Sequence, residues 1–194
     1  MRVIAGKFRS RRLRSLPGVD LRPTADRLRE TLFDVLTAGN PAVLEGTVWV
    51  DLYAGTGAVG IEAMSRGARM VHFVESSGRA AELIKQNLAS LGIETSFQIL
   101  KQDSSRALKG LELGDAAADF IFLDPPYDMK EAYPQTLQAL SKSRMLKPEG
   151  VVIAEHQKMF DPGEAFGTLR RYRKLVQGDA ALSFYRLVSS LRND

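Results

Sequence analysis

From Val48 onward, short apolar runs alternate with stretches of helical periodicity. The runs are "VWVD", "MVHFVE", "FQILKQD", "ADFIFLDPPY" and "GVVIAEH". Repeated strand–helix units with buried strands indicate a mostly parallel sheet that helices cover on both faces. We therefore predict an α/β fold with a doubly wound, Rossmann-like sheet. In such sheets, ligands bind beyond the carboxyl ends of the strands.

The two ends of the chain depart from this alternation. Residues 1–16 alternate loosely around a Gly-Lys-Phe-Arg-Ser turn, which favours a small hairpin. A helix is predicted to enter at Pro23-Thr24 and to end at Gly39-Asn40-Pro41. "TLRRYRKLV" and "ALSFYRLV" indicate a final strand pair. We predict a basic N-terminal hairpin extension at 1–20 and one domain at 21–194.

The composition excludes several kinds of site and several classes of protein. The chain has no cysteine, which excludes disulfides, thiolate zinc sites and cysteine nucleophiles, and its two histidines are too few for a ligand set, so no metal is expected. No apolar run approaches the ~20 residues that a membrane span needs. The basic start lacks the apolar middle of a secretory signal. These features predict a cytoplasmic protein without a membrane partner.

Positive charge is concentrated at the N-terminus. Residues 1–30 contain nine Lys/Arg and three Asp/Glu, whereas the other 164 residues contain 18 basic and 20 acidic groups. Such a patch is typical of proteins that bind a polyanion. The alternative is a solvated, frayed tail. The candidate nucleic-acid contacts are Arg2, Lys7, Arg9, Arg11, Arg12 and Arg14.

The loop after the first run carries the glycine fingerprint G-x-G-x-x-G, from Gly55 to Gly60. A dinucleotide loop receives a pyrophosphate, but Asp51 stands four residues before the first glycine. Two like charges 4 Å apart repel by roughly 4 kcal/mol at an effective dielectric of 20. S-adenosylmethionine (SAM) carries a sulfonium and an ammonium instead of phosphates, so an acid-rich pocket suits it.

Acidic residues also close the following strands, and each has a possible role toward SAM. Glu75 stands where one carboxylate can accept from both ribose hydroxyls, and Asp103 could accept from the adenine amino group. For any single one of these acids, a helix cap or surface turn is an equally good explanation. The predicted cofactor-binding residues are Asp51, Tyr53, Ala54, Gly55, Gly57, Glu75, Ser76, Asp103 and Ser104.

The motif Asp124-Pro125-Pro126-Tyr127 follows the buried strand "FIFL". Prolines cannot continue a central strand, so the chain must leave the sheet there. Asp124 and the Pro125 carbonyl are two acceptors, which match the two N–H groups of an exocyclic amine. Tyr127 offers a face on which a planar ring can stack. These four residues are the predicted catalytic site.

With these motifs the chain resembles a SAM-dependent methyltransferase of the amino-group type. More narrowly, it is similar to the bacterial 16S ribosomal RNA guanine-N2 methyltransferases, the RsmD family. The resemblance rests on "MRVIAGKFRSRRL", "RPTADRLRETLFDVL", "DLYAGTGAVGIEAMSRGA", "FVE", "FIFLDPPY" and "GDAALSFYR". It implies methylation of a guanine amine in small-subunit rRNA within an assembled or assembling 30S particle, by a monomer. It also implies that Arg22, Pro23 and Thr24 lie near the reacting pocket, and Arg22 and Thr24 join the predicted RNA contacts.

Other functions remain as alternatives. Adenine-N6 methylation of DNA or RNA is the nearest, because the Asp-Pro-Pro-Tyr motif suits adenine equally. A nicotinamide-dependent reductase is disfavoured by Asp51 and by that motif. A third alternative is a binding module without catalysis, which would use the basic N-terminal segment, here called the basic leader. This alternative does not explain the acids at four strand ends.

Overall fold

The computed structural model describes residues 1–15 and 23–188 and divides the chain into two compact units, Met1–Ala107 and Leu108–Asp194. The elements of the first unit are α1 (Pro23–Thr37), β1 (Val48–Leu52), α2 (Ala58–Ser65), β2 (Met70–Val74), α3 (Gly78–Ser90), β3 (Phe97–Leu100) and the start of α4 (Ser104–Leu113).

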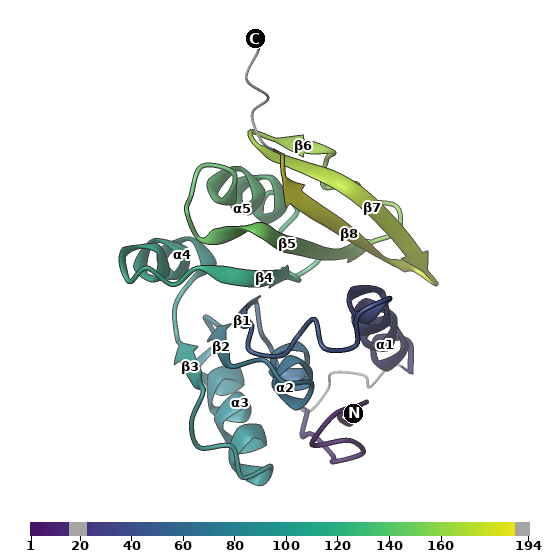
Figure 1. The fold of residues 1–194 in the computed structure, drawn as a ribbon, viewed down its shortest axis with the longest axis vertical. Coiled ribbons are helices and arrows are strands. Elements are labelled where there is room, and N and C mark those ends of the chain that lie inside the picture. The colour runs from purple at the N-terminus through teal and green to yellow at the C-terminus, as the bar shows by residue number, and fades with distance from the viewer. Residues whose placement is uncertain (16–22, 189–194) are drawn as a thin grey trace. The chain divides into compact units, whose positions relative to one another are not determined.

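The first unit is built on three parallel strands in the order β3-β2-β1 (Figure 1). All five residues of β1 are buried, as the apolar run predicts. Helix α2 packs against β1 and β2, and α3 packs against β3. Helix α1 joins this core through Phe33, whose ring stacks 5.5 Å from that of Trp49 in β1. The predicted strand–helix alternation is therefore present, with the carboxyl ends of the three strands at one edge.

The second unit combines a parallel strand pair with an antiparallel extension. Its elements are β4 (Ala118–Leu123), α5 (Ala132–Leu140), β5 (Leu146–Gln157), β6 (Ala165–Phe166), β7 (Leu169–Gln177) and β8 (Ala180–Leu187). Strands β4 and β5 are parallel, and β8, β7 and β6 continue from β5 in antiparallel order (Figure 1). The predicted final strand pair is confirmed as β7 and β8, whereas the two-residue β6 was not predicted.

Two elements of the second unit begin at positions with a clear physical reason. Pro134 lies in the first turn of α5, which begins at Ala132. The first four N–H groups of a helix have no partner within the helix, so proline is tolerated in the first turn. Strand β5 begins at Leu146, before the predicted "GVVIAEH", because Leu146 pairs with Ala118 of β4 ahead of a shift in register.

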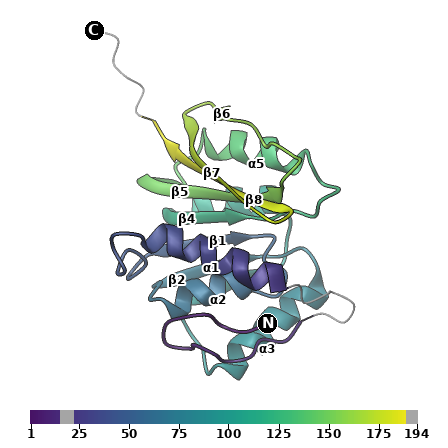
Figure 2. The same cartoon turned by 90° about the vertical axis from the view of Figure 1, so that its right-hand side faces the viewer.

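Residues 1–15 form two short antiparallel arms that lie beside α2 and α3 (Figure 2). Arg2 and Arg12 form an isolated antiparallel bridge, so the predicted hairpin is present without regular strands. Val3 and Leu13 are buried, which anchors both arms. The predicted boundary between residues 20 and 21 lies outside the described residues. Within the described ranges, no helix is both long and apolar enough to cross a membrane.

Candidate cofactor and substrate sites

The glycine loop after β1 turns sharply before it enters α2. Tyr53, Gly55 and Gly57 have φ angles of 64°, 54° and 77°, in the left-handed region. Gly57 directly precedes α2, and its N–H donates to the Ala54 carbonyl at 2.7 Å. Ala54 itself donates to the Val74 carbonyl at the end of β2. A side chain at Gly57 would be strained, so glycine is required for this entry into the helix.

Asp51 supports this loop from inside. Its side chain is 2% exposed, and its Oδ2 atom accepts a hydrogen bond from the Gly60 N–H at 2.9 Å. An acid in contact with the first turn of a helix satisfies one of the N–H groups that the helix leaves free. The predicted direct contact of Asp51 with SAM stays a prediction, and the hydrogen bond to Gly60 shows a structural task.

Glu75 holds the same loop from the neighbouring strand end. Its Oε2 atom accepts from the Gly55 N–H at 2.9 Å, and its Oε1 atom accepts from the Ser77 N–H at 2.7 Å. Each oxygen of an ionised carboxylate can accept a second hydrogen bond. The half-buried carboxylate is thus fixed against the glycine loop and can still accept from ligand hydroxyls, which fits the ribose of SAM.

Asp103 and Ser104 lie where α4 begins. Asp103 is exposed, and its Oδ1 atom accepts from the Arg106 N–H and the Ser105 hydroxyl. The Arg106 N–H, with smaller contributions from Ser105, lowers the pKa of Asp103. The Tyr53 and Ser104 hydroxyls are hydrogen-bonded at 2.7 Å, which joins the loop after β1 to α4.

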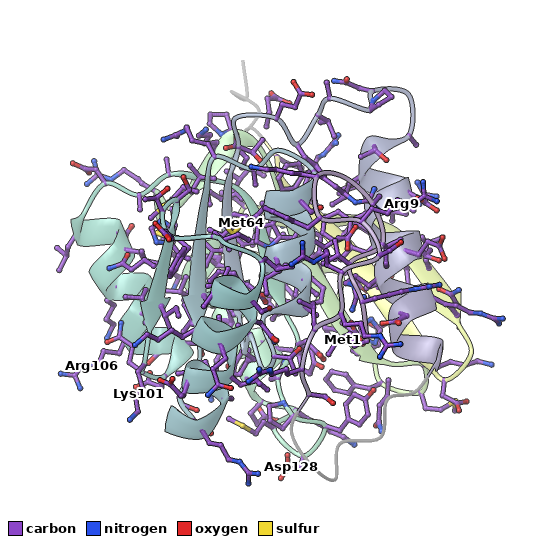
Figure 3. The ribbon with its side chains drawn as sticks, turned by 90° about the horizontal axis from the view of Figure 1, so that it is seen from below. Met1, Arg9, Met64, Lys101, Arg106 and Asp128 are labelled. Atoms are coloured by element: carbon purple, nitrogen blue, oxygen red, sulfur yellow. The ribbon has the colours of Figure 1, made fainter. Side chains whose placement is uncertain are left out.

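The surroundings of Asp103 are less acidic than the sequence pattern suggested. Lys101 and Arg106, its neighbours in the chain, lie along the same flank of the first unit in Figure 3. Asp103 therefore caps a helix between two basic residues, and one of its oxygens, Oδ2, accepts no hydrogen bond from the residues that the structure describes. The other two predicted cofactor residues differ in access, since Ala54 is buried and Ser76 is exposed.

The Asp-Pro-Pro-Tyr motif follows β4 in the second unit. Burial raises the pKa of Asp124 to about 7. Among the described residues, no donor reaches the Asp124 carboxylate or the Pro125 carbonyl, whereas the Pro126 carbonyl accepts from the Met129 N–H at 2.8 Å. The chain therefore makes a turn that begins at Pro126. The Asp124 carboxylate and the Pro125 carbonyl are left as two adjacent acceptors for another group.

Tyr127, the last residue of the motif, lies at a small hollow. It is 46% exposed, and the hollow is also lined by Lys130, Tyr133, Gln157 and Phe160. The Tyr133 hydroxyl donates to the Glu155 carbonyl, and the rings of Tyr133 and Phe160 lie 5.1 Å apart. These contacts fix Tyr133 and Phe160, while Tyr127 remains accessible.

The N-terminal segment is held on α2 by two polar side chains. Glu62 is fully buried and accepts from the N–H groups of Ile4 and Ala5 at 2.7 and 2.9 Å. Ser65 accepts from Phe8 through its hydroxyl. A Cβ atom on Gly6 would lie 1.9 Å from the Ser65 carbonyl oxygen, so this approach requires glycine. The alternative of a frayed tail is wrong for residues 1–15.

Asn87 of α3 fixes the other end of this segment. Its side chain is fully buried, and its carboxamide bonds both the N–H and the carbonyl of Arg14, at 2.8 and 3.1 Å. The same amide nitrogen donates to the Thr56 carbonyl in the glycine loop at 2.9 Å. One side chain therefore joins the N-terminal segment to the predicted cofactor loop.

The cations of the segment face solvent on this fixed backbone. All six predicted contacts within residues 1–15 are exposed, namely Arg2, Lys7, Arg9, Arg11, Arg12 and Arg14. None of them pairs with a carboxylate of the described residues. Arg22 lies outside the described residues, as does the side chain of Thr24.

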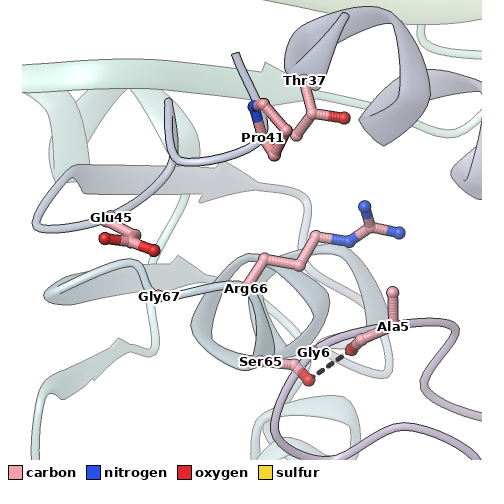
Figure 4. A pocket seen from close by; sticks show the side chains of 8 residues that line it. All are labelled: Ala5, Gly6, Thr37, Pro41, Glu45, Ser65, Arg66 and Gly67. Atoms are coloured by element: carbon pink, nitrogen blue, oxygen red, sulfur yellow. Dashed lines mark hydrogen bonds between the residues drawn. The ribbon is translucent and has the colours of Figure 1, made fainter.

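A hollow of about 480 Å³ lies between the N-terminal segment, α2 and the chain that follows α1. The Arg66 side chain crosses it with its guanidinium directed away from Glu45, which lies on the opposite wall (Figure 4). Arg66 is held by Glu62 at 2.8 Å and lies over the Phe33 ring. None of the predicted site residues lines this hollow, and its arginine is engaged in packing the segment.

The histidines take structural positions in the sheets. His72 is buried in β2 and bonds Gln98. His156 is buried in β5 and bonds Ser183. Burial lowers the pKa of both imidazoles. No three His, Asp or Glu side chains of the described residues lie together as metal ligands would.

Sequence reasoning missed the residues that support the sites. Glu62 carried a usable signal, because it is the one acid in the otherwise apolar stretch Ala58–Met64. A buried carboxylate requires partners, so such an acid indicates a second segment packed on the helix. Asn87 and Phe160 carried no comparable signal.

Comparison with known proteins agrees with this arrangement. The solved structure titled "Putative methyltransferase yhhF from Escherichia coli" superposes with a TM-score of 0.78 at 25% identity and covers 96% of this chain and 97% of that one. The Bacillus subtilis protein named "Putative rRNA methyltransferase YlbH" is 32% identical over 96% of this chain and 98% of its own length. The Haemophilus influenzae "Ribosomal RNA small subunit methyltransferase D" is 35% identical over 81% and 79%.

The fold and the glycine loop thus define a SAM-dependent methyltransferase with a Rossmann-like α/β sheet. A family profile described as "Conserved hypothetical protein 95" matches residues 1–186. The chain belongs to this family, which confirms the resemblance to the RsmD methyltransferases. SAM is its cofactor.

Proposed function

We propose that this protein methylates the exocyclic N2 amine of a guanine in 16S ribosomal RNA, and that it acts as a cytoplasmic monomer on an assembled or assembling 30S particle. Relatives named as ribosomal RNA small subunit methyltransferases support the RNA substrate. The observation that carries the chemistry is the pair of acceptors at Asp124 and Pro125, which no described donor occupies.

This acceptor pair suits an amine with two N–H groups. Guanine N2 is a poor nucleophile, because its lone pair is delocalised into the ring. Acceptors that bind both N–H groups favour the form of the amine in which that lone pair is free, and they stabilise the positive charge that develops on nitrogen. Tyr127, whose ring is accessible, would stack on the flat face of the base.

The chain's own residues would hold the cofactor in the first unit. When bound, SAM supplies a methyl group activated by its sulfonium. Glu75 would accept from the ribose hydroxyls with the lone pairs that Gly55 and Ser77 leave free. The glycine loop would follow the methionine part of the ligand, since its backbone is already fixed by Asp51 and Glu75. Because these contacts exist before binding, the site contributes mainly proximity and orientation.

The N-terminal segment would position the RNA. Its six exposed cations can bind phosphates, and such contacts fix register without reading sequence. The segment is fixed by Glu62, Ser65 and Asn87. It would therefore present a rigid basic surface to the RNA.

Single-turnover transfer of labelled methyl from SAM to undermethylated 30S particles tests this function. We expect N2-methylguanosine on nucleoside analysis, and no transfer to fully methylated particles. Free 16S rRNA in a parallel reaction decides whether the assembled particle is required. Methyladenosine as the product would establish the adenine-N6 alternative, and a lack of transfer to any RNA would contradict the proposal.

A further inference from the structure

One face of the C-terminal hairpin gathers arginines around an exposed tyrosine. We call it the β7 arginine face, and it consists of Arg170, Tyr172, Arg173 and Arg186. Arg170 lies directly opposite Arg186 in the β7–β8 ladder, so their side chains share a face. Arg173 lies opposite Phe184, two residues before Arg186, and therefore belongs to the same face.

Tyr172 is the extra residue of a bulge on this face. The register of β7 against β8 shifts between Arg171 and Arg173, and a bulge redirects the side chain that it carries. Tyr172 is 47% exposed, and its ring lies 6.2 Å from that of Phe184. The Arg186 guanidinium carbon lies 4.6 Å from its centroid. The bulge thus presents a stacked arginine–tyrosine pair to solvent.

The two faces of the hairpin differ in how their cations are partnered. On the opposite face, Arg171 pairs with Asp161 at 2.6 Å and with Glu164 at 3.0 Å, and Lys174 pairs with Asp161 at 3.0 Å. On the β7 arginine face, no carboxylate of the described residues pairs with any of the three arginines. All three are exposed, so within the described residues this face has positive charge that no carboxylate compensates.

Protection of a sheet edge explains only part of this pattern. Strand β7 pairs with β8 on one side, and on the other side β6 covers only Leu169 and Arg170. Charged residues on such an edge prevent pairing with another strand. That role would be served equally by Arg171 and Lys174 and requires no aromatic ring. The separation of paired from unpaired cations, with a tyrosine among the unpaired ones, indicates a ligand.

We propose that the β7 arginine face is a second RNA-binding surface, which holds an unpaired segment of the substrate RNA. The arginines would bind phosphates, and the Arg186–Tyr172 pair would offer a platform for one unstacked base. The proposal rests on the proposed function, because it takes RNA as the substrate. Its residues belong to the second unit, whereas the N-terminal cations belong to the first.

Binding of a fluorescent single-stranded RNA, measured across a range of salt concentrations, tests this surface. Arg173→Ala with Arg186→Ala should weaken binding and reduce the salt slope by about 1.4, since each neutralised phosphate contributes about 0.7 on single strands. Tyr172→Ala should weaken binding about 5- to 150-fold, which corresponds to 1–3 kcal/mol per stacked base. Tyr172→Phe keeps the ring and should bind within about twofold of the wild type.

Lys174→Ala is the matched control, because it removes a positive charge from the same strand but from the paired face. It should leave RNA binding within about twofold of the wild type. Equal losses in Lys174→Ala and in the arginine-face variants would overturn the proposal, as would variants that bind RNA like the wild type. Loss of binding to anionic vesicles without loss of RNA binding would assign the face to membranes and overturn it too. A wild-type protein that binds no RNA would overturn the proposed function as well.

Discussion

The strand-end carboxylates of the two units differ in the hydrogen bonds that they already accept. In the first unit, Asp51, Glu75 and Asp103 each accept at least one hydrogen bond from a backbone N–H group. In the second unit, Asp124 accepts none from the described residues, and burial raises its pKa to about 7. Acids that look alike in sequence therefore have two different roles. Those of the first unit are supports, because they hold the backbone. Asp124 is an available acceptor, which can bind a group of the substrate.

The largest effect should follow loss of the available acceptor. Asp124→Ala should reduce the single-turnover rate of methyl transfer by about 10²-fold or more, the scale for losing one oriented group. Its affinity for SAM should stay within a few-fold of the wild type. Asp128→Ala is the matched control, because Asp128 is an exposed acid just beyond the motif. A fully active Asp124→Ala enzyme would show that the free carboxylate of Asp124 has no catalytic role.

An intermediate effect should follow loss of a support that also faces the ligand. Glu75→Ala should weaken SAM binding about 10- to 150-fold, which corresponds to 1.5–3 kcal/mol for a hydrogen bond to a charged group. Part of this loss comes from the Gly55 and Ser77 N–H groups, which lose their partner. Isothermal titration with SAM measures it, with Glu82→Ala on exposed α3 surface as the control. An unchanged dissociation constant would remove Glu75 from the ribose role.

The smallest effects concern stability, and the two kinds of carboxylate should have opposite signs with pH. The pKa of Asp124 is raised in the fold, so the unfolded state ionises first and stability falls as pH rises from about 4 to about 7. Asp124→Asn removes this loss and should raise the Tm more at pH 8 than at pH 5.

The pKa of Asp103 is lowered in the fold, so its contribution is present above the unfolded pKa and is lost as pH falls through the folded pKa. Asp103→Asn should therefore lower the Tm at neutral pH, and this difference should disappear in acid. Thermal melts of both variants from pH 3 to pH 8 check the two signs. Curves parallel to the wild type for both variants would mean that neither carboxylate is perturbed by folding.

The sequence predicted the fold and the strand ends well, because both follow from local patterns. Apolar runs bounded by acids identified β1, β2 and β4, and the glycine fingerprint identified the entry into α2. Sequence could not distinguish supports from available acceptors, since that depends on which backbone N–H groups approach each oxygen. Asp51 illustrates this limit, because its bond to Gly60 depends on how the glycine loop turns into α2.

The basic leader is a second case in which the sequence pattern did not show which contacts a segment makes. Its charge predicted a polyanion-binding surface, but charge does not distinguish a fixed segment from a frayed one. The distinction depends on Glu62 and Asn87, which contact residues more than 50 positions away in the chain. Such long-range contacts leave no periodic trace in a sequence.

The three hydrogen bonds of Asn87 have a consequence for attempts to exchange parts between related enzymes. The carboxamide serves Arg14 and Thr56 at once, so the leader and the glycine loop share one buried partner on α3. A chimera with a foreign leader of different backbone course would leave the carboxamide atoms that bond Arg14 buried without partners, beside the bond that the same amide makes to Thr56. Leader, loop and α3 should therefore be transplanted as one module, although they are separate in the chain.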